Sequence, residues 1–176
     1  MAENRPQSQG ATHPVFDPRK IIEALNRHRV GYIVVGGFAA TLYGCPEQTF
    51  DLDILYTDTA DNRARLLAAL ADIAARWDEP LSDAMLQRQP VFALNTAFGD
   101  LDILSNVLGV GTYQQATSRI ESFDVGGETV QVLNLAALIA AKEAAADPNP
   151  RKRSALEYLR ALQQQRQQPD NSSLGT

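Results

Sequence analysis

The sequence predicts an α+β domain with a small mixed β-sheet flanked by helices. Predicted helices and strands alternate along the first half of the chain, and further strands and then two helices follow. The chain has 176 residues, 44% of them hydrophobic, which is enough for one core. We therefore expect one domain over residues 15–166, with a sheet core over 15–133 and a helical part over 134–166. The ends, 1–14 and 167–176, are polar and rich in turn formers, and we expect disordered tails there.

The first half of the chain contains five predicted elements. They are a helix over residues 17–30, a strand over 32–37, a short helix over 38–44, a strand over 48–56 and a helix over 61–76. Asp17 is a suitable N-cap for the first helix, and Pro18 suits its first position. Gly36 and Gly37 are expected to end the first strand.

The second half contains three predicted pairs of elements. They are strands over residues 90–96 and 101–105, a hairpin over 122–133, and helices over 134–146 and 153–165. Gly126 and Gly127 separate two alternating runs, which is a strong hairpin pattern. Asn134 is the expected N-cap of the first of these helices.

Composition excludes several classes of protein. The net charge of −5 and the pI near 5.0 argue against a general nucleic-acid coat. Cys45 is the only cysteine, so an internal disulfide and a multi-cysteine zinc site are excluded, and His13 and His28 are too scattered to suggest a metal site. No apolar run suits a membrane span or a signal peptide, which predicts a soluble cytoplasmic protein without membrane contact. The basic run Arg151–Arg153 indicates a solvated helix start.

Two similar acidic stretches are the most informative feature of the sequence. "DLDIL" occurs at residues 51–55, and "DLDIL" occurs again at 100–104. Residues two apart on a strand share a face, so Asp51 and Asp53 point to one side while the leucine and isoleucine between and after them face the core. Like charges about 6 Å apart repel by roughly 2–3 kcal/mol per pair at a dielectric of about 20. If the two strands are neighbours, the carboxylates form a candidate site for Mg²⁺, unless one pair is simply a solvent-facing edge.

The glycine pair before the first acidic stretch suggests a phosphate site. In "VVGGFAATLYG", a strand leads through Gly36 and Gly37 into a helix, and glycine there lets backbone N–H groups approach a phosphate. Alone, the pair indicates only a tight turn. With a metal-binding D-x-D stretch nearby, it indicates a nucleoside triphosphate held between a helix start and Mg²⁺.

The pattern GG-x6-G-x4-T-x-D-x-D followed by "LDIL" resembles the polymerase-β-like nucleotidyltransferase superfamily. The stretch "VLNLAALIAAKEAA" strengthens the resemblance to its minimal bacterial branch, the AbiEii-like toxins of abortive-infection and toxin–antitoxin systems. The resemblance spans about residues 17–162, and it implies a nucleotidyltransferase-like fold with C-terminal helices.

This resemblance also implies roles for individual residues. Asp51, Asp53 and Asp102 would bind two Mg²⁺ ions, with Asp102 as ligand or as base for the incoming hydroxyl. Gly36, Gly37, Thr49 and Lys142 would contact the phosphates. Asp100 is expected to be a turn or capping residue.

Two positions depart from the pattern of the superfamily. Glu47 stands where an arginine usually precedes the threonine, and a carboxylate there repels a triphosphate. The last helix, which usually opens with "K-D" and has a later aspartate, has Lys152 and Ala155 at the likely equivalent positions. A charge from Arg63, Arg88 or Arg119 could replace the missing arginine.

Three functions remain open from the sequence. The first is a Mg²⁺-dependent nucleotidyltransferase that moves a nucleoside monophosphate from a triphosphate to a hydroxyl of RNA, tRNA or protein, as a toxin with a cognate antitoxin. The second is a degenerate nucleotide-binding or partner-binding protein of the same fold, which Glu47 favours. The third is a plain interaction domain in which the acidic stretches are strand patterning.

Overall fold

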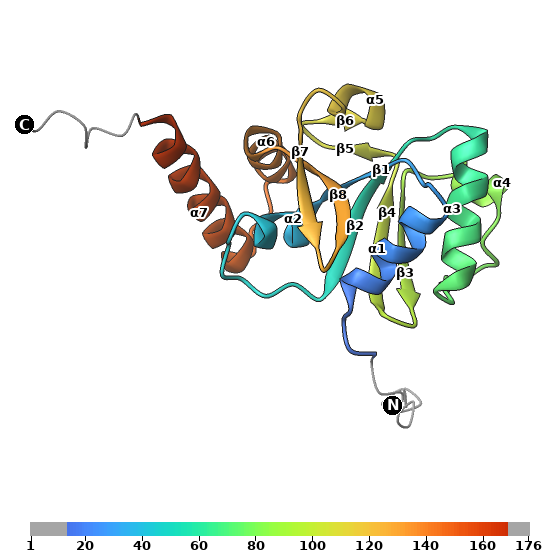
Figure 1. The fold of residues 1–176 in the computed structure, drawn as a ribbon. Helices are drawn as coiled ribbons and strands as arrows, with labels where there is room; N and C mark the ends of the chain where they lie inside the picture. The colour runs from blue at the N-terminus through green and yellow to red at the C-terminus, as the bar shows by residue number, and fades with distance from the viewer. Residues whose placement is uncertain (1–13, 169–176) are drawn as a thin grey trace, which may run out of the picture.

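The computed structural model describes residues 14–168 and confirms a mixed α+β architecture (Figure 1). The helices are α1 (Pro18–Arg27), α2 (Gly36–Leu42), α3 (Ala60–Asp72), α4 (Asp83–Leu86), α5 (Tyr113–Ala116), α6 (Leu135–Ala145) and α7 (Pro150–Gln167). The strands are β1 (Tyr32–Val35), β2 (Asp51–Tyr56), β3 (Val91–Thr96), β4 (Gly99–Leu104), β5 (Asn106–Val107), β6 (Gly111–Thr112), β7 (Ile120–Val125) and β8 (Glu128–Leu133). The tails predicted for 1–14 and 167–176 lie almost wholly outside the described residues, and the domain boundaries stay predictions.

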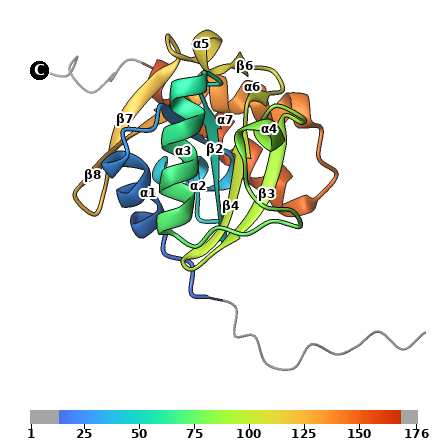
Figure 2. The ribbon, with the colours of Figure 1, turned by 90° about the vertical axis from the view of Figure 1, so that its right-hand side faces the viewer.

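Six strands form one mixed sheet in the order β3-β4-β2-β1-β8-β7. The pairs β2–β4 and β1–β8 are parallel, and the other three neighbouring pairs are antiparallel. Helices α1 and α3 lie on one side of the sheet, whereas α2, α6 and α7 lie on the other (Figures 1 and 2). The second acidic stretch therefore runs parallel to the first on the neighbouring strand.

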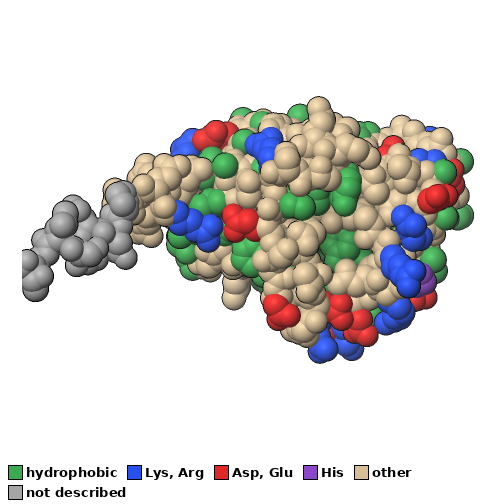
Figure 3. Space-filling model, turned by 45° about the horizontal axis from the view of Figure 1, so that its top comes forward, with side chains coloured by type: hydrophobic (Ala, Val, Ile, Leu, Met, Phe, Trp, Pro, Cys, Tyr) green, Lys and Arg blue, Asp and Glu red, His purple; other side chains and the backbone are tan. Residues whose placement is uncertain are grey.

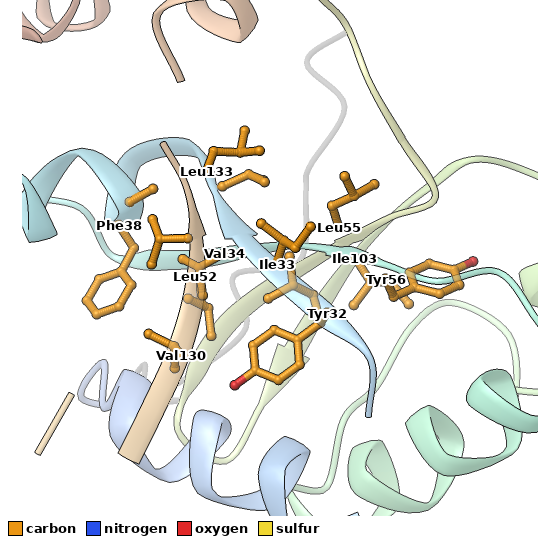
Figure 4. Packing of buried hydrophobic residues seen from close by; sticks show 14 of the residues in the cluster. Tyr32, Ile33, Val34, Phe38, Leu52, Leu55, Tyr56, Ile103, Val130 and Leu133 are labelled. Carbon is orange, nitrogen blue, oxygen red and sulfur yellow. The ribbon is translucent and has the colours of Figure 1, made fainter. Parts of the chain in front are cut away.

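The core lies on both sides of β1 and β2. All four residues of β1 are buried, as expected for a central strand covered on both faces. Figure 4 shows β1 residues Tyr32 and Val34 near Leu52 of β2 and Val130 of β8, and all four side chains are at most 6% exposed. This packing fixes the strand that carries Asp51 and Asp53. Among the described residues, no helix is long and apolar enough to cross a membrane.

Local chemistry explains where the predicted helices begin. The Asp17 side chain accepts a hydrogen bond from the Lys20 amide, and the Asn134 side chain accepts one from the Ala137 amide, so both predicted N-caps are confirmed. Helix α2 begins at Gly36 itself, directly after β1. The predicted glycine turn is thus the first turn of a helix.

Several expectations need correction. Asp100 does not lie in a turn: it belongs to β4 and pairs in register with Asp51 of β2. Helix α3 ends at Asp72 and not at Arg76, because Ala74 adopts a positive φ and Arg76 instead pairs with Asn95 at the edge of β3. The short elements α4, α5, β5 and β6 were not predicted, since two to four residues carry too little periodicity.

Candidate active site

Three carboxylates meet on the face of the sheet that α2 and α6 cover. Asp51 and Asp53 lie on β2. Asp102 lies on the neighbouring strand β4, where it is the register partner of Asp53. One carboxylate oxygen of each of these three residues lies within 4.8 Å of the corresponding oxygens of the other two. Leu52 and Ile54, on the opposite face of β2, are fully buried, so the alternation expected from the sequence is confirmed.

Two of the three carboxylates, Asp53 and Asp102, bind a proton more tightly than an ordinary carboxylate, because the pKa of each is raised. Burial raises the pKa of Asp53 from its usual 3.8 to about 7, and the neighbouring charges of Asp51 and Asp102 add to this effect. Burial, Asp51 and Asp100 likewise raise the pKa of Asp102. A divalent cation bound by these oxygens would replace the repulsion with attraction, and oxygen ligands of this kind suit Mg²⁺. The residues present therefore fit a hard divalent metal.

The start of α2 packs tightly against the carboxylates. Gly36 has φ +67°, and a Cβ atom at this position would collide with the Asp53 carboxylate. A Cβ atom on Gly37 would lie 2.8 Å from Thr49 Oγ1. At position 36, only glycine combines a positive φ with so close an approach to a neighbouring side chain. The backbone N–H of Gly37, in the first turn of α2, donates a hydrogen bond to the Asp53 carboxylate, so this helix start lies directly beside the acidic group.

Thr49 connects the glycine turn to the carboxylates. Its hydroxyl donates a hydrogen bond to Asp51 Oδ1 at 2.6 Å. This bond holds one oxygen of Asp51 in place. The predicted site residues Gly36, Gly37 and Thr49 are therefore brought together with Asp51 and Asp53.

Lys142 lies on α6 and lines the same cleft as the carboxylates. Burial lowers its pKa, while the neighbouring groups Cys45, Asp53 and Glu47 act in the opposite direction. The Lys142 charge in turn lowers the pKa of Asp53. The structure thus places all seven predicted site residues around one cleft of about 940 Å³.

The opposite wall of this cleft is formed by α6 and α7 and is rich in cations. Besides Lys142, the basic residues that line it are Arg151, Lys152, Arg153 and Arg160. Lys152 Nζ lies 2.6 Å from Asp147, and Arg160 forms a 2.6 Å ion pair with Glu143. Basic and acidic side chains also lie beside one another on the α7 side of the surface in Figure 3. Asp147, and after it Asp53 and Asp51, raise the pKa of Lys152.

These cations correct two expectations from the sequence. The run Arg151–Arg153 does begin a helix and is exposed, but it also lines the cleft and is not merely solvated. None of the three proposed substitutes for the missing arginine, Arg63, Arg88 and Arg119, lines the cleft. Arg63 pairs instead with Asp58 and Asp83, and Arg88 pairs with Glu79. A basic first turn is opposed by the helix dipole, and this could have singled out the run in the sequence.

Comparison with solved structures shows a similar fold in other proteins. The antibiotic-resistance factor ANT(2'')-Ia matches with a TM-score of 0.56 and 19% identity, over 85% of this chain and 90% of that one. The lincosamide antibiotic adenylyltransferase LnuA, solved with lincomycin bound, matches with a TM-score of 0.60 and 13% identity, over 84% and 98%. A putative nucleotidyltransferase from Thermotoga maritima, TM1012, matches with a TM-score of 0.52 and 16% identity, over 87% and 96%.

A search of curated protein sequences finds no match. Residues 16–170, nearly the whole chain, match a family described as nucleotidyl transferase of unknown function (DUF2204). This match and the shared fold agree with the acidic group and the glycine turn. The chain therefore belongs to this nucleotidyl transferase family.

Proposed function

We propose that the protein is a divalent-metal-dependent nucleotidyltransferase that moves a nucleoside monophosphate from a triphosphate to an acceptor hydroxyl. The observation that carries the proposal is the meeting of Asp51, Asp53 and Asp102 beside the first turn of α2. Polyphosphate oxygens and backbone N–H groups are complementary there. The cations of α6 and α7 on the facing wall offer further charge for a triphosphate.

The chain's own residues supply most of the chemistry in this proposal. Asp51, Asp53 and Asp102 would hold two Mg²⁺ ions, which when bound stabilise negative charge on the phosphates. Gly36, Gly37, Thr49 and Lys142 would bind and orient the triphosphate.

The transfer step itself is an in-line displacement. The acceptor oxygen forms a bond to the α-phosphorus, the bond from that phosphorus to the oxygen bridging to the β-phosphate breaks, and pyrophosphate leaves. Asp102 would accept the proton of the acceptor hydroxyl.

The AbiEii-like resemblance extends the proposal to a biological role. In that version the protein is a cytoplasmic toxin, the acceptor is a hydroxyl of RNA, tRNA or a protein, and a cognate antitoxin binds it. The solved structures with the same fold include enzymes named for antibiotics, which makes a small-molecule hydroxyl a second kind of acceptor. These acceptors and the antitoxin stay predictions.

The second candidate is a nucleotide-binding member without transfer activity, which Glu47 favours because it brings an extra carboxylate into the cleft. One experiment separates the two. The protein is incubated with Mg²⁺, each α-labelled nucleoside triphosphate, and total tRNA or cell lysate. The transferase would be supported if label transfer is abolished by Asp53→Ala. Label transfer should be preserved by the control Asp61→Ala, which lies on the other side of the sheet. Triphosphate binding without transfer under any condition would support the second candidate.

A further inference from the structure

Helix α7 brings its first turn to the same cleft as the acidic group and the glycine turn. Helices α2, α6 and α7 all lie on one side of the sheet (Figures 1 and 2). Ala155 and Leu159 of α7 are buried, and the Tyr158 hydroxyl donates a hydrogen bond to the Tyr43 carbonyl, just after α2. These contacts fix α7, so that its first turn forms part of the wall of the cleft.

Two of the cations that line this wall have carboxylate partners. Lys152 Nζ lies 2.6 Å from Asp147 Oδ2, on the loop between α6 and α7. Arg160 Nε and Nη2 both donate to Glu143 Oε1 of α6, at 3.1 and 2.6 Å. Both ion pairs therefore connect α7 to α6 or to the loop that follows it. A cation that is already paired in this way has less charge to offer a ligand.

Arg151 and Arg153 line the same wall without such partners. Within residues 14–168, neither of them forms an ion pair, and the Arg153 guanidinium donates one hydrogen bond, at 3.3 Å, to the Pro148 carbonyl. Both arginines are exposed and line the cleft. A guanidinium group can bind a phosphate through two parallel hydrogen bonds. These two side chains are therefore the cations of α7 that can bind an anion.

The position of these arginines is electrostatically unfavourable without an anion. The N-terminus of a helix carries partial positive charge, so acidic residues are favoured in its first turn and basic residues are not. Helix α7 has no acidic residue there, and its N-cap is the neutral Asn149. Helix α1 also begins with proline, arginine and lysine, but its N-cap is the charged Asp17. The start of α7 thus carries cations that its own turn does not offset, and an anion in the cleft would offset them.

A triphosphate in this cleft directs its terminal phosphates toward α7. In the proposed transfer, the α-phosphate lies beside Asp51, Asp53 and Asp102. The β- and γ-phosphates, which carry most of the charge of the molecule, extend from there past the glycine turn at the start of α2. Because α7 lies on the same side of the sheet as α2 and lines the same cleft, these phosphates approach its basic first turn.

Resting on the proposed function, we infer that Arg151 and Arg153 bind the β- and γ-phosphates of the triphosphate, whereas Lys152 and Arg160 hold α7 in place. The two arginines then also bind the pyrophosphate as it leaves, because pyrophosphate consists of these two phosphates. Their positive charge offsets the charge that develops on the oxygen of the breaking bond. The basic start of α7 thus acts both in binding the donor and in the transfer step.

Glutamine variants test this division between free and paired cations. Arg151→Gln and Arg153→Gln each remove one charge, and glutamine has a helix propensity close to that of arginine. Arg160→Gln removes a paired cation of the same wall, and Arg19→Gln is the matched control at the similar start of α1, outside the cleft.

Binding of three ligands is measured by calorimetry at about 0.15 M salt, where distant charges are screened. The first ligand is tripolyphosphate with Mg²⁺, which has phosphates but no nucleoside. The second is the α,β-methylene analogue of each nucleoside triphosphate with Mg²⁺, because the bond that transfer would break is replaced in it. The third is total tRNA, as a different source of phosphates.

We expect Arg151→Gln and Arg153→Gln each to lower the affinity for tripolyphosphate and for the bound analogue by about tenfold. Arg160→Gln should lower these affinities by at most about threefold, and Arg19→Gln should leave them within about twofold of the wild-type values.

Two results would overturn the inference. Equal losses in Arg160→Gln and in the other two cleft variants would show only a general attraction by positive charge. Unchanged affinity for tripolyphosphate in Arg151→Gln and Arg153→Gln would exclude them from the donor phosphates, and weaker tRNA binding in the same variants would assign them to a polyanionic acceptor instead. If the wild-type protein binds neither tripolyphosphate nor any analogue with Mg²⁺, the proposed function itself is wrong.

Discussion

Asp53→Asn tests the electrostatic account of the site most directly, because Asp53 carries the largest cost of ionisation. Its pKa is raised from 3.8 to about 7, first by burial and then by Asp51 and Asp102. At about 1.4 kcal/mol per pKa unit, this corresponds to roughly 4 kcal/mol between the protonated and ionised forms. The metal-free folded protein thus carries a destabilised carboxylate at neutral pH.

The sign of the effect follows from proton binding. The folded protein binds a proton at Asp53 more tightly than the unfolded chain does, so this group favours folding below about pH 4. That contribution is lost as the pH rises to about 7. The asparagine side chain of the Asp53→Asn variant carries no charge at any pH used in the assay. It should therefore raise the free energy of unfolding in EDTA by between about 1 and 4 kcal/mol at pH 8, relative to wild type, and by much less at pH 4.5.

The assay is urea denaturation of wild type, Asp53→Asn and the control Asp61→Asn at both pH values, with EDTA or with Mg²⁺. Mg²⁺ should stabilise the wild type at pH 8 because it binds only the folded state, and it should have little effect on Asp53→Asn. The reasoning is refuted if Asp53→Asn in EDTA is no more stable than wild type at pH 8. It is equally refuted if Asp61→Asn shows the same pH-dependent gain.

Three further predictions concern the surroundings of Asp53. Because Mg²⁺ competes with the proton on Asp53, Mg²⁺ affinity should rise about tenfold per pH unit below pH 7 and then level off, as calorimetry at pH 6, 7 and 8 can show. A flat profile would contradict this. Gly36→Ala should lower the free energy of unfolding, measured by urea denaturation, by at least about 1 kcal/mol more than Gly127→Ala does. Both glycines have a positive φ, but of the two only Gly36 lies against a side chain. Equal losses in the two variants would exclude the predicted collision. Lys142→Gln should weaken Mg²⁺–triphosphate binding about tenfold while Lys20→Gln, on α1, leaves it unchanged, and equal affinities would remove Lys142 from the site.

The acidic site was predictable because it depends on two local rules. Alternation along a strand puts Asp51 and Asp53 on one face whatever the rest of the fold, and a glycine pair between a strand and a helix indicates a close approach of the backbone. Joining Asp102 to them required β2 and β4 to be neighbours, which the sequence allowed but did not determine. The parallel register of these strands confirms that condition.

The surroundings of the site were less predictable for a different reason. Asp100 was interpreted as a turn residue because Gly99 precedes it, yet the hairpin turn is so tight that β4 already begins at that glycine. Arg151 and its neighbours lie on a helix whose position depends on the packing of α7 against α6. No local pattern in the sequence reports that packing, so the cationic wall of the cleft became visible only in three dimensions.

Glu47 has a different meaning in the folded protein than in the sequence. Read alone, it places a carboxylate where a triphosphate would be repelled. In the structure it lines the cleft with Lys142, and it is one of the groups that raise the pKa of that lysine against the lowering effect of burial. A half-buried lysine that lost its proton would offer a phosphate no charge at all. Glu47 therefore acts together with Cys45 and Asp53 against the effect of burial on Lys142. Because α7 brings further cations to the same cleft, a glutamate at this position is by itself no evidence that triphosphate binding has been lost.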